Sequence, residues 1–319
     1  MVKKNFVSAL LFVSVVFSAS AQQDKIITHF IYDKMSINPG ETGIDEGICG
    51  TSVYRNQWDK VSGAPNSAIL NVEANINRFF PGGVGISFFH DAIGFVRQNN
   101  VLLNYAYPVH TRFGTLGIGA GAGMINVGMQ PDWVPPTQAI DKSLPIGFSK
   151  SGLDLNFGLY WKGTGGYYAG ISSTHLSATR LSQSFTVGSG PLTLNGISTY
   201  NSARHYYAMG GYTYPIGPGK LDANVLIRTD FVKLSSDVNI RYLMGNNTLK
   251  YYGGLTYRTS DALAVMIGGT MNNFTLGYSY DYTIGKLSSI SQGTHEVLLK
   301  YCYYLPDPKK SPSKHPRWL

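Results

Sequence analysis

Apolar and polar side chains alternate at every second residue near the end of the chain. The apolar positions are Phe274, Leu276, Tyr278, Tyr280, Tyr282 and Ile284, and the positions between them are Thr275, Gly277, Ser279, Asp281 and Thr283. A period of two is that of a β-strand whose two faces meet different surroundings. The pattern recurs through most of the chain, which predicts a membrane β-barrel with lipid outside and a polar lumen inside.

Fourteen strands of this kind are expected. They cover residues 48–55, 67–76, 83–90, 97–108, 114–127, 151–162, 165–174, 202–214, 219–230, 236–244, 248–259, 262–270, 273–284 and 293–304. Turns after even strands are short and rich in Gly, Pro and Asn, whereas the long connections, 128–150 and 175–201, follow odd strands and are expected outside the cell. The fold class is therefore all-β: a transmembrane antiparallel β-barrel of about 14 strands with both termini periplasmic.

The same alternation sorts polar side chains into the lumen. The inward set contains Asn71, Glu73, Asn75, Asp154, Asn156, Tyr160, Lys162, Asp222, Asn224, Arg228, Asp237, Asn239, Arg241, Lys250, Arg258, Asp281, Glu296 and Lys300. Both signs of charge are present, which favours pairing across the lumen over an ion-selective pore with a wall of one sign. Gly117, Gly119, Gly121 and Gly123 also share one face, and either an inserted segment or barrel curvature explains this row.

The chain divides into four parts. Residues 1–21 form a signal peptide, with Lys3 and Lys4 before an apolar run and Ala19-Ser20-Ala21 as the cleavage site, so the mature chain begins near Gln22. Residues 22–47 form a periplasmic N-terminal segment or a plug, residues 48–305 the barrel, and residues 306–319 a basic, Pro-rich tail. This arrangement predicts localisation in a bacterial outer membrane as a multi-pass barrel.

Composition agrees with a lipid-facing surface. Charged residues make up 14% of the 319 residues, with 37 glycines and 22 tyrosines, against roughly 25% charged residues in soluble domains. The net charge of +8 falls to +6 without Lys3 and Lys4 and lies largely in the tail, so it does not indicate nucleic-acid binding. Cys49 and Cys302 fall in the first and last strands, where a disulfide and two unpaired, small apolar side chains are both possible.

Several short motifs, taken in order, resemble one protein family. They are Ile37-Asn38-Pro39-Gly40, the stretch from Tyr54 to Trp58 followed by Gly63-Ala64-Pro65, His90-Asp91-Ala92-Ile93-Gly94, Asn104-Tyr105-Ala106-Tyr107, and Gly277 to Tyr282 with His295-Glu296. From about Gln23 to Tyr304 the chain resembles the PorP/SprF membrane proteins of the type IX secretion system of Bacteroidota. Residues 39–43, Pro-Gly-Glu-Thr-Gly, depart from the Asn-Pro-Ala-x-x-Gly form common in that family, and the tail after Leu305 matches no motif of it.

The resemblance implies a non-enzymatic outer-membrane component of the secretion and gliding machinery. Its partners would be other type IX secretion subunits and cargo proteins that carry a C-terminal domain, besides outer-membrane lipid. The resemblance implies export or surface attachment of such cargo.

Two groups of motif residues are candidate sites. Tyr54, Arg55, Asn56, Gln57 and Trp58 lie at the end of the first strand, where they form either a membrane-interface anchor or, with Arg55 and Trp58 exposed as a pair, a surface for a partner. From this position Arg55 can reach either a phosphate group or a lumenal carboxylate. His90, Asp91 and Gly94 are expected to form a turn in which Asp91 accepts backbone hydrogen bonds and Gly94 supplies an unusual backbone angle, with a metal-binding or catalytic His–Asp pair as the less favoured alternative.

No catalytic, cofactor or metal site is assigned from the sequence. The seven histidines form no H-x-x-x-H or Cys/His cluster. A lipid hydrolase would need a serine, a histidine and an acidic or amide partner together at the outer membrane leaflet, and Ser173, His175 and Ser177 are the nearest candidates. The alternative to a secretion component is a porin or hydrophobic-solute transporter: an open channel of one sign would favour transport, and a filled barrel a scaffold.

Overall fold

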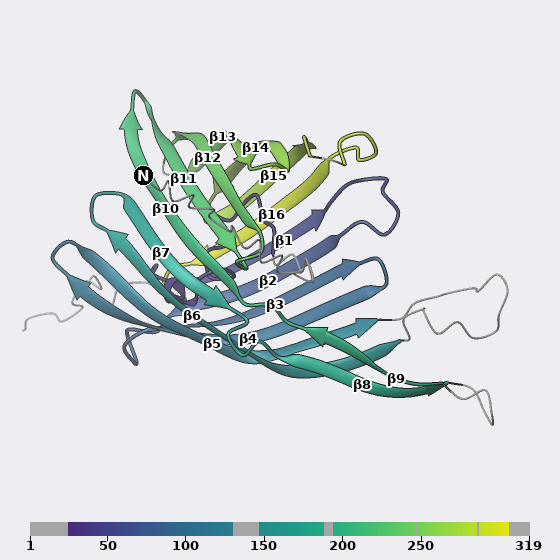
Figure 1. Ribbon diagram of the computed structural model, residues 1–319. Coiled ribbons are helices and arrows are strands. Elements are labelled where there is room, and N and C mark those ends of the chain that lie inside the picture. The colour runs from purple at the N-terminus through teal and green to yellow at the C-terminus, as the bar shows by residue number, and fades with distance from the viewer. Residues whose placement is uncertain (1–24, 130–146, 188–193, 247, 286, 306–319) are drawn as a thin grey trace, which may run out of the picture.

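Antiparallel strands close into a barrel in the computed structural model (Figure 1). The structure describes residues 25–129, 147–187, 194–246, 248–285 and 287–305. Within these residues the barrel strands are β1 (Ile48–Asn56), β2 (Asn66–Asn75), β3 (Gly83–Ile93), β4 (Val96–Thr111), β5 (Gly114–Met129), β6 (Phe148–Gly163), β7 (Tyr167–Thr174), β10 (His205–Ile216), β11 (Gly219–Thr229), β12 (Leu234–Gly245), β13 (Leu249–Arg258), β14 (Ala262–Met271), β15 (Phe274–Thr283) and β16 (Thr294–Tyr303).

The predicted barrel of fourteen strands is confirmed. Each predicted strand corresponds to one barrel strand, and no boundary is displaced by more than three residues. β1 pairs with β2 on one side and with β16 on the other, where Ile48 lies opposite Tyr303 and Asn56 opposite His295. Every edge within the described barrel is therefore paired, which removes the open strands that a membrane barrel must avoid.

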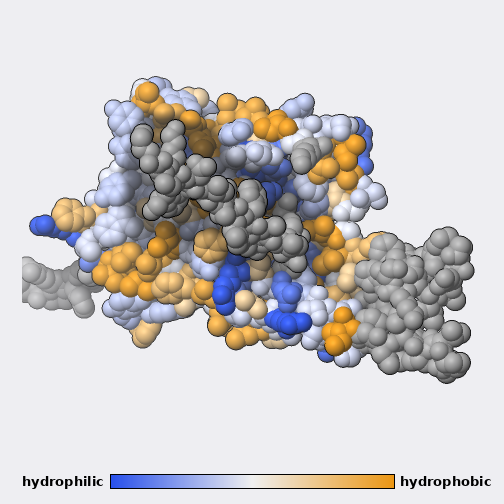
Figure 2. Space-filling view, in the orientation of Figure 1, coloured by the Kyte–Doolittle hydropathy of each residue, from blue (hydrophilic) through white to orange (hydrophobic). Residues whose placement is uncertain are grey.

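The inward and outward faces also follow the alternation. Leu153 and Leu276 are more than half exposed on the outer wall, whereas Asp154, Asp281 and Glu296 are at most 1% exposed. Figure 2 shows apolar residues spread over the outer wall seen from this side. A barrel with this distribution presents hydrocarbon to the membrane and keeps its polar groups inside.

The two ends of the barrel differ. We call the end that holds Ile48 and Tyr303 the base mouth and the end that holds Asn56 and Thr294 the loop mouth. β4, β5 and β6, with 16 residues each, are the longest of the described strands. Predicted loop 128–150 starts from this tall wall at the loop mouth, and its residues 130–146 lie outside the described part of the chain.

The second long connection contains a hairpin that the sequence did not predict. Within 175–201, β8 (Arg180–Val187) pairs with β9 (Leu194–Asn201) beyond the barrel (Figure 1). Leu181 packs with Ile125, Val127 and Phe148 of the tall wall. The hairpin was missed because its strands are short and rich in Ser and Thr, without the long apolar face that marks the barrel strands.

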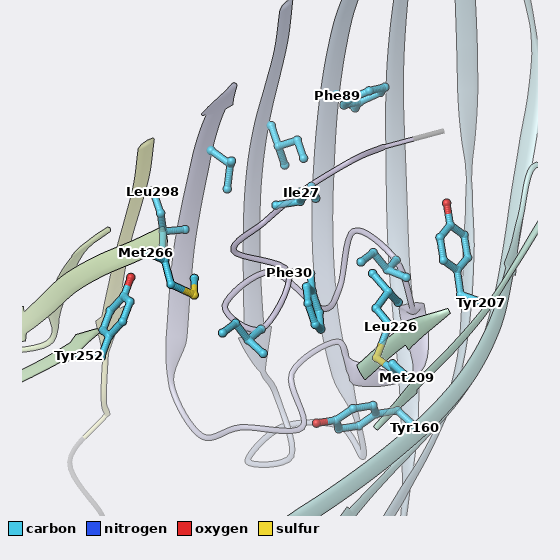
Figure 3. Close-up of a cluster of buried hydrophobic side chains, with 14 residues drawn as sticks. Ile27, Phe30, Phe89, Tyr160, Tyr207, Met209, Leu226, Tyr252, Met266 and Leu298 are labelled. Carbon is cyan, nitrogen blue, oxygen red and sulfur yellow. The ribbon is translucent and has the colours of Figure 1, made fainter. Parts of the chain in front are cut away.

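Residues 25–47, which we call the lumenal segment, lie inside the barrel. Ile27 and Phe30 are at most 2% exposed and share a cluster with inward-facing residues of the wall (Figure 3). Residues Pro39–Glu41 form a short 3-10 helix, η1, with Asn38 as its N-cap. The main apolar core of the molecule therefore lies between the lumenal segment and the wall.

Cys49 and Cys302 form a disulfide across the pair of strands that closes the barrel. The sequence left open whether these two cysteines are paired or unpaired. In the structure they are paired, and the disulfide joins the first and last strands near the base mouth. Among the described residues, no helix is both long and apolar enough to cross a membrane.

Candidate functional site

Six charged residues of the lumen form a network of ion pairs beside β1 and β16, the two strands whose pairing closes the barrel. Alternation turns Arg55 of β1, Asp281 of β15 and Glu296 of β16 inward, and closure of the barrel sets Arg55 opposite Glu296. Arg55 donates from Nη2 to Asp281 Oδ2 and from Nη1 to Glu296 Oε2, each at 2.9 Å. All three side chains are at most 3% exposed. Charges buried this deeply need partners on every side.

Three further strands, β13, β12 and β11, extend the network around the wall. Arg258 of β13 donates from Nη1 to Asp281 Oδ2 at 3.1 Å and from Nε to Asp237 Oδ1 at 3.0 Å. Asp237 of β12 also pairs with Arg228 of β11. Three guanidinium groups thus alternate with three carboxylates along this side of the lumen, so their charges balance.

Besides the ion pairs among its own residues, the network makes hydrogen bonds to the lumenal segment. Glu296 accepts hydrogen bonds from the backbone N–H groups of Thr28 and His29 at 2.9 and 2.7 Å, and its Oε1 lies 2.7 Å from His29 Nδ1. The Thr28 hydroxyl donates to Asp281 Oδ2 at 2.8 Å. Hydrogen bonds to ionised groups are stronger than neutral ones, so these carboxylates fix the segment to the wall.

Aromatic rings hold the middle of the segment. Lys34 Nζ lies 4.1 Å from the centroid of the Tyr168 ring and donates to the Tyr160 hydroxyl at 3.1 Å. Arg241, which pairs with Asp222 at 2.7 Å, lies over the ring of Tyr32 with its Cζ 4.7 Å from the centroid. Such cation–π contacts gain strength when water is excluded.

The backbone of η1 lies directly against the backbone of β5 and β6. The Asn38 side chain donates to the Leu159 and Ile171 carbonyls at 2.9 and 3.3 Å. A Cβ on Gly40 would lie 2.8 Å from the carbonyl oxygens of both Gly117 and Gly158, and a Cβ on Gly119 would overlap the Pro39 carbonyl. Glycine at position 40, the departure from the family form, thus suits the close approach of η1.

The glycine row on β5 has two causes, one for each half. Gly117 and Gly119 admit η1, whereas a Cβ on Gly121 would meet Asn104 and one on Gly123 the backbone of Val101. The inserted segment therefore accounts for the first pair, and the close approach of β4 for the second.

A cavity opens at each mouth. The loop-mouth cavity, of about 490 Å³, is lined by Ile26, Trp58, Arg228, Val232 and Leu287 among others. The base-mouth cavity, of about 420 Å³, is more polar and includes Asp45, Glu73, Lys250 and Lys300. The lumenal segment lies between them, since Ile26 lines the first and Tyr32 and Asp45 the second.

The candidate residues 54–58 are divided between the two sides of the wall. Tyr54 is 49% exposed on the outside, whereas Arg55 and Gln57 are buried, and Trp58 and Asn56 are half-buried. Trp58 lines the loop-mouth cavity. The predicted exposed pair of Arg55 and Trp58 is therefore wrong at Arg55, but the lumenal carboxylate expected as one possible partner of Arg55 is present, as Glu296 and Asp281. The outward position of Tyr54 suits the interface anchor, which stays a prediction.

The second candidate group lies at the end of β3 rather than wholly in a turn. Gly94 has a φ of 54°, as expected for an unusual turn conformation. His90 and Asp91 remain in the strand: His90 Nδ1 lies 2.7 Å from Asn99 Oδ1, and Asp91 accepts a hydrogen bond from the Ser67 hydroxyl at 2.6 Å. These contacts link β2, β3 and β4, and the structural role of the group stays a prediction.

The nearest hydrolase candidates lie at the end of β7 and in the residues directly after it. His175 Nδ1 lies 2.9 Å from Asp154 Oδ1, an acid–imidazole pair that the sequence did not indicate. The Ser177 hydroxyl donates to the Leu153 carbonyl at 2.8 Å, and Ser173 is buried. Within the described residues, no group of three or more His, Cys, Asp or Glu could hold a metal ion.

The main contribution that sequence reasoning missed is that of Thr28 and His29. The inward orientation of Asp281 and Glu296 follows from strand period, but the lumenal segment has no such period, so nothing linked its residues to the carboxylates. The only signal was the large number of charged side chains on the inward face, which need partners once they are buried.

The sequence was compared with protein families and with curated proteins. The sequence profile of the type IX secretion system membrane protein family PorP/SprF matches residues 19–301. A comparison with curated proteins gives no match.

Among solved structures, the toluene transporter TbuX of Ralstonia pickettii is similar with a TM-score of 0.53 at 13% identity, covering 85% of this chain and 93% of its own. A deletion mutant of the monoaromatic hydrocarbon channel TodX gives a TM-score of 0.52 at 11% identity, with 84% and 93% covered. At this identity the similarity is one of fold.

Proposed function

Because the chain belongs to the type IX secretion system membrane protein family PorP/SprF, we propose that it is a non-enzymatic outer-membrane component of that machinery. In this role it supports export or surface attachment of specific cargo proteins. The family match over residues 19–301 is the observation that carries the proposal. The partners are other secretion subunits and cargo with a C-terminal domain, and the protein reaches the outer membrane after cleavage near Ala21.

The filled lumen favours a role as a scaffold for other proteins and disfavours passage of a solute through the barrel. Buried ion pairs of Arg55, Arg258 and Glu296 hold the lumenal segment, and removing one member of such a pair commonly costs several kcal/mol. A solute crossing the barrel would have to displace this segment. The surfaces left for function are the two mouths and the outer wall.

The alternative function is that of a porin or hydrophobic-solute transporter. One observation favours it: the loop-mouth cavity has apolar walls, including Ile26, Trp58 and Leu287, and its volume of about 490 Å³ is typical of small-molecule sites. The lumenal segment lies beneath that cavity, so uptake requires a second state of the barrel.

Deletion of the gene separates the two functions. We expect a small set of surface proteins to disappear from the outer membrane, measured by quantitative proteomics of surface-labelled cells, with unchanged uptake of small solutes. Complementation with the wild-type gene should restore the set, and affinity purification from native outer membranes should recover secretion subunits. Lost uptake of a solute with an intact surface proteome would establish the transporter instead.

A further inference from the structure

The lumenal segment runs through the barrel from one mouth to the other. Before β1, the Gly43 N–H donates to Glu73 Oε2 at 2.9 Å and its carbonyl accepts from Asn75 at 2.8 Å, both at the base mouth. At the other end, Arg228, next to the last residue of β11, donates to the Lys25 carbonyl at 3.3 Å. The first described residue is therefore at the loop mouth, although β1 starts at the base mouth.

The distance to the predicted cleavage site is short. Three residues, Gln22 to Asp24, precede Lys25 in the predicted mature chain, and three extended residues reach at most about 10 Å. β1 has nine residues, a length of about 30 Å along the strand. Three residues cannot cover this distance, so a chain that begins at Gln22 cannot bring its amino terminus back to the base mouth.

The loop-mouth cavity lies where the segment ends. Ile26 is one of its lining residues, and Asp230, Lys233 and Asp261 are others. Partial burial opposes ionisation of Asp230, but the backbone N–H groups of Lys233 and Val232 donate to its carboxylate and hold its pKa below the usual range. The cavity thus offers a carboxylate to a cation and, at Lys233, an ammonium group to an anion.

We propose that the loop-mouth cavity is the docking site of the protein's own mature amino terminus, residues Gln22 to Asp24. In its uncyclised form the new α-ammonium group faces Asp230 and Asp261, the second of which also pairs with Arg258 at 3.4 Å, and the Asp24 carboxylate faces Lys233 and Arg228. The occupant is fixed by chain length and by charge complementarity. The mature amino terminus then lies on the same side of the membrane as the long loops, opposite to the start of β1.

Disulfide cross-linking in native outer membranes tests this site. Val232 is 56% exposed and lines the cavity, so Gln23→Cys with Val232→Cys should cross-link under mild oxidation, detected as a linked peptide by mass spectrometry. The matched control combines Gln23→Cys with Thr164→Cys, in the turn at the base mouth, and should not cross-link. Preference for position 164, or no cross-link in either pair, would overturn the proposal.

Two further measurements test where the mature chain begins and on which side of the membrane it lies. The mass of the purified protein should correspond to a chain that begins at Gln22, either intact or cyclised to pyroglutamate with loss of ammonia, and a chain that retains the signal peptide would contradict the inference. Gln23→Cys alone should react with a membrane-impermeant maleimide from the same side as Lys60→Cys, in the loop after β1, and labelling from the side of Thr164→Cys would overturn it. None of these outcomes depends on the secretion role.

Discussion

Glu296 is the residue on which the docking of the lumenal segment most depends. Its carboxylate accepts from the backbone of Thr28 and His29 and from Arg55, and it is fully buried. Glu296→Gln keeps the shape but places an amide N–H₂ among these donors. We expect a loss of about 3–5 kcal/mol in the free energy of unfolding, because Arg55 keeps a buried charge with fewer acceptors.

Urea unfolding of the detergent-solubilised barrel, followed by tryptophan fluorescence, measures this loss. Glu46→Gln is the matched control: Glu46 is exposed at the base mouth, and the same change there should alter stability by no more than about 0.5 kcal/mol. Equal stability of the two variants would mean that Glu296 does not hold the segment.

Gly119 tests the close contact between η1 and the wall. Gly119→Ala adds a Cβ that overlaps the Pro39 carbonyl, and since backbone lies on both sides, relief requires movement of the segment at a cost of about 1–3 kcal/mol. We expect faster tryptic cleavage after Lys34 in the assembled barrel. Gly253→Ala, whose Cβ meets nothing within 4 Å, should cleave like the wild type, and equal cleavage of both variants would refute the contact.

At the scale of single elements, the sequence specifies the strands well and the segment poorly. A strand between lipid and lumen must alternate, so β15 could be placed within a residue of its observed bounds, Phe274–Thr283. The lumenal segment is surrounded by wall on all sides and has no outward face, so no period marks it. Its contacts join residues more than 250 positions apart, as between Thr28 and Glu296, which local pattern cannot reveal.

The register of β15 gives a prediction at this scale. Leu276 is 51% exposed on the outer wall, while Thr275 points into the base-mouth cavity. Leu276→Arg should cost up to about 2–4 kcal/mol, depending on its depth in the bilayer, and lower the amount of assembled barrel in outer membranes. Thr275→Arg should assemble nearly normally because the cavity has room for the side chain. Equal damage from these adjacent substitutions would contradict the register.

For the whole molecule, barrel closure is what turns local pattern into a site. Pairing of β1 with β16 brings Arg55 to Glu296 and Cys49 to Cys302, although each pair is far apart in the sequence. The number of strands and the inward set were predictable, because both follow from period and turn chemistry. The threading of the lumenal segment was not, because an even strand count fixes only where the wall begins and ends.

The orientation of the barrel in the membrane follows from its unequal mouths. Outer-membrane barrels have short periplasmic turns and longer extracellular loops, so the loop mouth should face the outside. Protease added to intact cells should therefore cut within 128–150 or 175–201 and spare the base-mouth turns at 80–83 and 163–166, as read from peptide masses. We expect cleavage within 175–201 to be slower than within 128–150, because β8 and β9 pair over most of residues 175–201 and Leu181 is buried against β5 and β6. Cleavage confined to the short turns would invert the orientation, and the mature amino terminus, placed at the loop mouth, would invert with it.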